Sequence, residues 1–363
     1  MVSGQKVSPS LYGLKHTNKD FSLKESWGKN QFNTAFPTAL GCYMHHKGVA
    51  PIYLVLNPNL EVEQETIKVS DIYGTDPLAD ETFYAFENQY NRYQHLVNNG
   101  LPRIDLVINR LQDQQLSPVR GIEIKLTALP DHTTFSESEE SYGCEIVIRP
   151  DTIVYLALSI ALKFQNEVNT LKDLIRPYLK DIQENDWYDP DVMRESSDQI
   201  IGAIDVVLFS RLSQQEPFLL QPIWKTEGKT LILHENCLDI FVWSDYALTR
   251  LFIDICKSSS NRQKITRHYR TAIWLAKMLV DFSRKGKIDQ RGVIDHLTYD
   301  TKNDKAFAVS GKITRKYMKS DQMISPRIKR NEIKNIILNG GEKMLSPERR
   351  FDAAILGTSE IFG

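Results

Sequence analysis

Residues 101–126 read LPRIDLVINRLQDQQLSPVRGIEIKL, and this stretch decides the fold that the sequence predicts. Apolar residues alternate with other residues along 103–111, and a second alternation runs along 119–126. A period of two is typical of β-strands, because successive side chains of a strand point to opposite faces. A polar linker at 112–118 would let the two strands pair in antiparallel fashion. The stretch therefore predicts a β-hairpin.

Three charged side chains fall on this predicted hairpin. Asp105 lies on the first strand, and Glu123 and Lys125 share one face of the second. If the strands pair in register, two carboxylates and an ammonium group meet on one face. Paired carboxylates repel each other and attract a hard divalent cation such as Mg²⁺, which activates water and neutralises charge on a phosphate oxygen. With Asp105 and Glu123 as metal ligands and Lys125 beside the attacking water or the phosphate, the pattern predicts phosphodiester hydrolysis.

The same residues have a simpler interpretation, since a Glu-x-Lys pair arises by chance in most chains of this length. Two further acids are candidates for the site. Glu87 lies on the polar face of a helix predicted at 80–98 from the spacing of its aromatic residues. Glu25 lies in a predicted helix that begins at Ser22. A solvated helix residue and half of a capping box, respectively, are the alternatives for these two acids.

The composition is that of a globular chain with room for a large core. Of the 363 residues, 41% are hydrophobic and 25% are charged. The four cysteines are widely spaced, which disfavours a zinc site or a disulfide framework and fits a reducing compartment. The first residues are polar, and the most apolar stretch, at 152–164, is too short to span a bilayer. A cytoplasmic protein without a membrane partner is therefore expected.

Positive charge is concentrated near the C-terminus. Residues 1–256 carry 22 Lys and Arg against 35 Asp and Glu, whereas residues 257–350 carry 23 against 9. Such an excess is typical of a nucleic-acid partner, although a merely basic surface has the same composition. Several cations lie at or just before a helix predicted at 265–282, where they oppose the helix dipole, so phosphate is their expected partner. The candidate DNA-binding residues are Arg262, Lys264, Arg267, Arg270, Lys312, Arg315 and Lys316.

The rest of the chain predicts an α/β fold in which helices flank a mixed central sheet. Further strands are expected at 50–57 and 143–149, and Asp151 is expected to cap an apolar helix at 152–169. We predict a catalytic core at residues 1–215 and a basic, largely helical α+β DNA-binding region at 216–363. The alternative is that both regions form one continuous domain.

The hairpin resembles the core of the PD-(D/E)xK nucleases, a mixed sheet flanked by helices. It departs from that motif because Pro102-Arg103-Ile104-Asp105 stands where Pro-Asp is expected. Longer stretches resemble the HindVP-type restriction endonucleases over most of residues 10–165. They read LYGLKHTNKDFSLKESWGKNQFNTAFPTALGCYMHHKG, FENQYNRYQHLVNNGLPRIDLVI and GIEIKLTALPD.

The resemblance implies a Mg²⁺-dependent type II restriction endonuclease. Asp105 and Glu123 would bind the metal, and Lys125 would serve the attacking water. The substrate would be duplex DNA cut at a short palindrome like GRCGYC to leave 5′-phosphates. A homodimer would match the palindrome, and a DNA methyltransferase would be the functional partner.

Three alternatives to this function stay open. The first is a structure-selective repair or junction nuclease with the same core. The second is a DNA-binding protein without catalysis, in which the charged residues of the hairpin are only a solvated strand face. An RNA-binding or scaffold protein is the third, and it is disfavoured because the sequence carries no known RNA-binding module.

Overall fold

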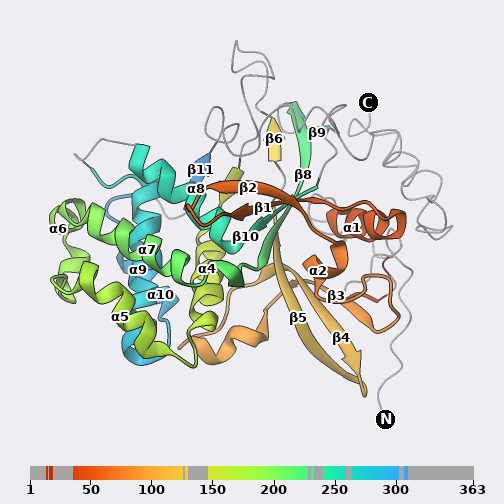
Figure 1. Ribbon diagram of the computed structural model, residues 1–363, viewed down its shortest axis with the longest axis horizontal. Helices are drawn as coiled ribbons and strands as arrows, with labels where there is room; N and C mark the ends of the chain where they lie inside the picture. Colours follow the sequence, from red (N-terminus) through yellow and green to blue (C-terminus); the bar gives the residue numbers. More distant parts are fainter. Residues whose placement is uncertain are drawn as a thin grey trace.

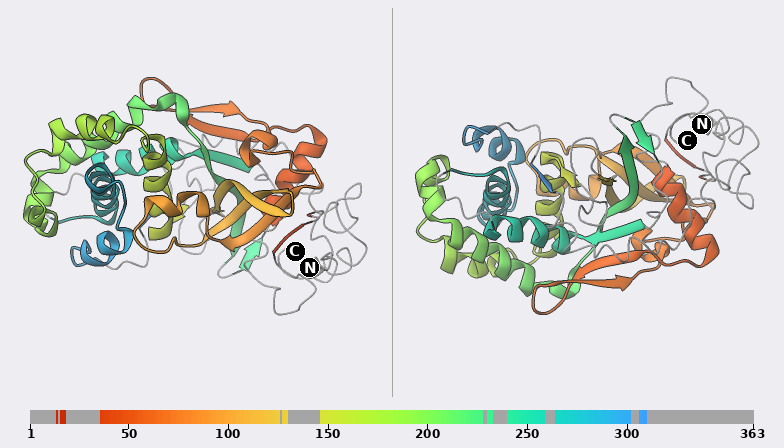
Figure 2. Two further views of the ribbon diagram at one scale, coloured as in Figure 1. Left: turned by 90° about the horizontal axis from the view of Figure 1, so that it is seen from below. Right: turned by 90° about the horizontal axis from the view of Figure 1, so that it is seen from above.

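The computed structural model describes residues 14, 16–18, 36–125, 127–129, 146–227, 230–232, 240–258, 264–301 and 306–309. They form a mixed β-sheet with a large group of helices on one face and two short helices on the other (Figure 1). Figure 2 shows the green and blue helices gathered at one side of the orange strands. This arrangement confirms the predicted α/β fold.

The sheet follows the spatial order β2, β1, β10, β8, β5, β4, β3. These strands are β2 (Val62–Thr66), β1 (Ile52–Leu56), β10 (Ile240–Ser244), β8 (Pro217–Glu227), β5 (Gln115–Ile124), β4 (Ile104–Gln112) and β3 (Thr82–Asn88). β1 pairs with β10 and β5 pairs with β8 in parallel, while the other neighbours are antiparallel, so the sheet is mixed.

Strands from the C-terminal part of the chain lie inside this sheet. β8 and β10 follow position 215, yet they stand between β1 and β5. The later part of β8 also pairs with two short strands, β6 (Thr127–Leu129) in parallel and β9 (Thr230–Ile232) in antiparallel fashion. Strands from both predicted regions, 1–215 and 216–363, therefore pair within one sheet. A separate two-stranded sheet joins β7 (Ile146–Ile148) to β11 (Phe307–Val309).

The predicted hairpin is confirmed, but its second strand begins earlier than expected, at Gln115. β4 and β5 stay paired as far as Gln112 and Gln115, and only Asp113 and Gln114 form the turn. Both turn residues have positive φ angles, 49° and 65°, which suits a two-residue hairpin turn. The predicted linker at 112–118 was therefore wrong. A register shift between Ile108 and Asn109 marks an irregularity in the pairing, next to which a proline is tolerated in the opposite strand.

Alternate residues of the strands pack into two hydrophobic cores, one on each face of the sheet. Phe241 and Trp243 pack with the large helical layer, whereas Ile240 and Val242 pack with the two short helices. The helical layer contains α4 (Pro150–Lys163), α5 (Val168–Leu179), α6 (Pro190–Glu195), α7 (Ser197–Ser210), α8 (Asp245–Ser258), α9 (Arg267–Lys285) and α10 (Gln290–His296). The opposite face is covered by α1 (Phe36–Lys47) and α2 (Val69–Tyr73). Across the described ranges, no helix has the length and apolar character needed to cross a membrane.

Two further predictions about local structure were wrong. The expected helix at 80–98 is the strand β3 followed by a short 3₁₀ helix, Asn91–Leu96. Its aromatic residues recur at helical spacing, but Tyr84 and Phe86 lie on one face of a strand whose other face is also buried, at Ala85. Asp151 does not cap α4, because the helix already begins at Pro150, a residue well suited to a first turn.

Candidate active site

The register of the hairpin sets Asp105 beside Glu123. Leu106 stands opposite Ile122, so Asp105 and Glu123 are the next two residues along the antiparallel pair. Lys125 follows β5 directly, and its Nζ contacts Oε1 of Glu123. The three residues predicted for catalysis therefore lie together at one end of the hairpin.

The acids of this cluster influence one another electrostatically. Burial, and after it the negative charge of Glu123, raises the pKa of Asp105 to about 7. The charge of Lys125 and a 2.8 Å hydrogen bond from the Ile124 N–H to Asp105 Oδ2 act in the opposite direction. The Glu123 side chain is itself buried, with 6% of the residue exposed. The cluster thus has two carboxyl groups, Asp105 and Glu123, for the one ammonium group of Lys125.

The first turn of α4 adds two residues that the sequence analysis did not assign to the site. Thr152 donates a hydrogen bond from Oγ1 to Glu123 Oε1 at 3.1 Å. Burial, and after it the charge of Glu123, raises the pKa of Asp151. Only the position of these two residues at the start of an apolar helix was visible in the sequence. Their approach to β5 depends on how that helix packs.

The two predicted ligands fit a divalent cation. One oxygen of each carboxylate is held by the protein: Asp105 Oδ2 by the Ile124 N–H, and Glu123 Oε1 by Lys125 and Thr152. Within the described residues, no hydrogen bond reaches the second oxygen of either carboxylate, and no group of three His, Cys, Asp or Glu side chains could hold an ion by itself. Mg²⁺ commonly takes one or two carboxylates and keeps several waters, so this donor set suits it.

The two additional acids have different outcomes. Glu87 lies on β3 between Phe86 and Asn88, which pair with Leu106 and Ile104, so it stands next to Asp105. Its charge contributes to the raised pKa of Asp105, and its φ angle of 49° is uncommon for a residue other than glycine. Glu87 thus belongs to a strand beside the site, and the helix predicted for it was wrong. Glu25 lies outside the described residues.

Arg270, predicted as a phosphate contact, is a core residue. It is 0% exposed, its guanidinium lies 4.4 Å from the centroid of the Trp274 ring, and it donates to the Thr301 carbonyl oxygen at 3.0 Å. A buried guanidinium cannot reach DNA without unfolding its surroundings, so this prediction was wrong. Lys264 is exposed, and Arg267 is half-buried at the start of α9. Four further candidates lie outside the described residues: Arg262, Lys312, Arg315 and Lys316.

Two exposed arginines lie two residues before the acids Asp105 and Asp151 in the chain. Arg103 comes two residues before Asp105, and Arg149 directly precedes α4. The charges of Lys125 and Arg149 oppose the rise in the pKa of Asp151. Both arginines are isolated in the sequence, so no cluster of charge marked them.

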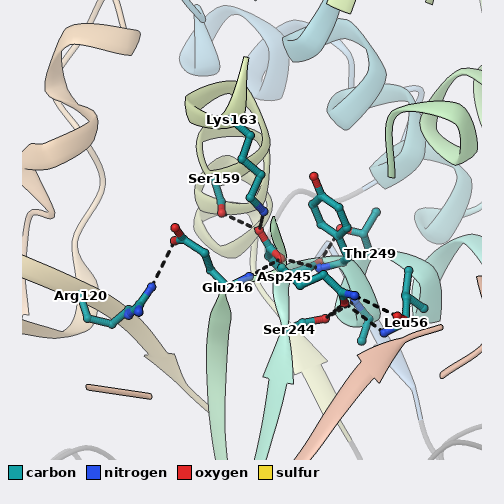
Figure 3. Close-up of polar contacts among 11 residues, drawn as sticks. Leu56, Arg120, Ser159, Lys163, Glu216, Ser244, Asp245 and Thr249 are labelled. Atoms are coloured by element: carbon teal, nitrogen blue, oxygen red, sulfur yellow. Dashed lines mark hydrogen bonds and ion pairs between the residues drawn. The ribbon is translucent and has the colours of Figure 1, made fainter. Parts of the chain in front are cut away.

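A buried ion pair holds the other end of α4 (Figure 3). Asp245 is 0% exposed, and its Oδ2 accepts from Ser159 Oγ at 2.6 Å and from Lys163 Nζ. Its Oδ1 accepts from the backbone N–H groups of Glu216, at 3.1 Å, and Tyr246, at 2.8 Å. The network joins α4 to β8 and α8. Because both oxygens of Asp245 are bonded to the protein, we assign the network a structural role rather than a catalytic one.

Asp105→Asn is expected to stabilise the metal-free protein, and to do so more at pH 8 than at pH 5. The carboxyl has an ordinary pKa of 3.8 and a folded-state pKa of about 7. As the pH rises from 4 to 7 the unfolded state ionises first, so the folded state loses relative stability, and above pH 7 the loss is complete. The gain at pH 8 should be on the order of 1–3 kcal/mol. Urea unfolding of both proteins in EDTA measures this gain in stability. Equal gains at pH 5 and pH 8 would contradict a raised pKa of Asp105 in the folded protein.

Comparison with known proteins places the chain among restriction enzymes. The family model described as HindVP restriction endonuclease matches residues 27–362. The "Type II restriction enzyme HgiDI" of Herpetosiphon aurantiacus is 48% identical over 354 residues, which cover 98% of this chain and 97% of that protein. The "Probable type II restriction enzyme HindVP" of Haemophilus influenzae is 42% identical over 356 residues, covering 98% of this chain and 96% of that protein. No solved structure matches the chain.

Proposed function

The chain belongs to the HindVP restriction endonuclease family, and from this premise we propose that it is a Mg²⁺-dependent type II restriction endonuclease. One observation carries the catalytic part of the proposal. Asp105 and Glu123 stand side by side with one oxygen each held by the protein, and Lys125 contacts the same cluster. Two carboxylates and an adjacent ammonium group are what metal-assisted cleavage of a phosphodiester requires.

Each residue of the cluster has a defined role in this proposal. When bound, Mg²⁺ supplies an activated water and neutralises charge on the phosphate. Asp105 and Glu123 would hold the ion. Lys125 would orient Glu123 through their contact, and it would present a donor to the attacking water or to the phosphate oxygen that gains charge. The protein thus positions the reacting groups before the substrate arrives.

The proposed substrate is duplex DNA with a short palindromic site, of the GRCGYC kind, and cleavage leaves 5′-phosphates. A palindrome is read most simply by a two-fold dimer in which each subunit cuts one strand. A DNA methyltransferase that modifies the same site would protect the host genome, as a functional rather than a physical partner.

Arg103 and Arg149 are proposed to bind DNA phosphates beside the scissile bond. Replacing either by Ala should weaken binding to all sequences alike and reduce the slope of log K against log[salt] by about 1, because each phosphate contact releases condensed counterions. Fluorescence anisotropy over a range of NaCl concentrations measures both effects. Arg176→Ala, at an exposed position on α5, is the matched control. If discrimination between sites falls while the salt slope stays constant, these arginines read bases instead.

The proposed function is tested by incubating the purified protein with phage DNA, with and without Mg²⁺, next to Glu123→Gln. Discrete bands that need both Mg²⁺ and Glu123 are the expected result, and sequencing the fragment ends gives the site. A smear would contradict sequence-specific cutting and favour a structure-selective or nonspecific nuclease. DNA that is shifted on the gel but intact would contradict catalysis and favour a DNA-binding protein.

A further inference from the structure

We propose that Thr152 is a positioning residue for Glu123: its hydroxyl group fixes one carboxylate oxygen so that the other stays available to the metal ion. The inference rests on the metal-binding role proposed above for Glu123. It assigns to α4, which contributes no predicted ligand, a part in forming the metal site.

The contact is buried at both ends. Thr152 is 0% exposed and Glu123 is 6% exposed, and the distance from Oγ1 to Oε1 is 3.1 Å. Lys125 contacts the same oxygen. The terminal torsion of a glutamate is broad, so one donor alone leaves the carboxylate free to turn. Two donors that approach Oε1 from different elements fix its plane, and within the described residues Oε2 has no hydrogen bond of its own.

The helix itself is held in register with the sheet. Thr152, Tyr155, Ser159 and Lys163 recur at intervals of three and four, so they lie along one side of α4. Tyr155 donates from its hydroxyl to the Pro102 carbonyl oxygen at 2.6 Å, just ahead of the strand that carries Asp105. Ser159 and Lys163 bind Asp245. Contacts along the length of the helix therefore determine where the Thr152 hydroxyl stands.

A buried hydroxyl must find some hydrogen-bond partner, so the contact alone does not establish a role in metal binding. Substitution separates the two explanations. Thr152→Val keeps the shape of the side chain and removes the donor, whereas Thr152→Ser keeps the donor and removes a methyl group. Thr249→Val is the matched control, since Thr249 is also 0% exposed but donates to the backbone carbonyl oxygen of Asp245.

The test is calorimetric titration of the full-length protein with Mg²⁺ alone, together with thermal unfolding in EDTA to show that each variant is folded. Partners of a metal ligand typically contribute 10–100-fold to metal affinity. We expect Thr152→Val to weaken Mg²⁺ binding by about that factor, Thr152→Ser to stay close to wild type, and Thr249→Val to leave binding unchanged. The Mg²⁺ concentration for half-maximal cleavage should rise in parallel for Thr152→Val.

Each other outcome has a definite meaning. Wild-type Mg²⁺ affinity in Thr152→Val, while Glu123→Gln loses it, would overturn the role of Thr152 and leave the proposed function intact. Equal losses in Thr152→Ser and Thr152→Val would overturn it as well, because the methyl group and its packing would then be responsible. Mg²⁺ binding that Glu123→Gln leaves unchanged would overturn the metal-binding role of Glu123, and the inference with it.

Discussion

Lys125→Ala is expected to lower the rate of DNA cleavage by about 10³-fold or more while DNA affinity stays close to that of the wild type. Removing one well-placed donor of charge stabilisation typically costs 10²–10³-fold in rate. Here the same ammonium group also contacts Glu123 Oε1, so its loss leaves that oxygen with the Thr152 hydroxyl as its remaining partner among the described residues. DNA affinity should change little because the charge of Lys125 is already paired with the Glu123 carboxylate.

Single-turnover cleavage with saturating Mg²⁺ measures the rate, and fluorescence anisotropy in EDTA measures the affinity. Lys172→Ala, which removes an exposed lysine of α5, should cut at the wild-type rate. Full activity in Lys125→Ala would remove Lys125 from the catalytic cluster. A parallel loss of rate and affinity would instead indicate that Lys125 contributes to substrate binding.

The hairpin and its three charged residues could be predicted because the signals are local. Alternation with a period of two sets the strands, and antiparallel pairing of neighbouring strands brings Asp105 opposite Glu123 without any distant contact. The turn was predicted too long because both faces of the hairpin tip are exposed. Even Leu111 and Leu116 are exposed there, so apolar and polar residues do not alternate. A pattern of apolar residues marks a strand only where one face meets a core.

The rest of the site depends on packing between distant segments. Thr152 reaches Glu123 only because the start of α4 packs beside β5, and nothing near residue 152 in the sequence indicates that contact. Arg270 was wrongly predicted to contact phosphate, because a sequence shows its charge but not its burial against Trp274. The insertion of β8 and β10 between β1 and β5 is likewise a matter of tertiary order. Local patterns thus predicted the charged residues of the hairpin, whereas the residues that position them became visible only in the structure.

Lys163→Met is expected to destabilise the protein by about 3–5 kcal/mol, since removing one partner of a buried ion pair leaves the other charge uncompensated. Figure 3 shows Lys163 pointing toward Asp245. The Asp245 side chain is 0% exposed and the Lys163 side chain 6%. The Lys163 Nζ also lies 4.0 Å from the centroid of the Tyr246 ring, so the variant loses a cation–π contact as well. Urea unfolding monitored by circular dichroism measures the free-energy difference.

Two comparisons decide whether burial of the charge is the cause. Lys257→Met removes one of two cationic partners of Asp205, which keeps its pair with Arg250, at a position where the lysine side chain is 42% exposed. Its cost should therefore stay within about 1 kcal/mol. Adding Asp245→Asn to Lys163→Met should recover part of the loss. The amide oxygen can still accept from the backbone N–H groups of Glu216 and Tyr246, and no bare charge remains. A double variant that loses the sum of both single effects would show that Lys163 stabilises α4 by packing alone.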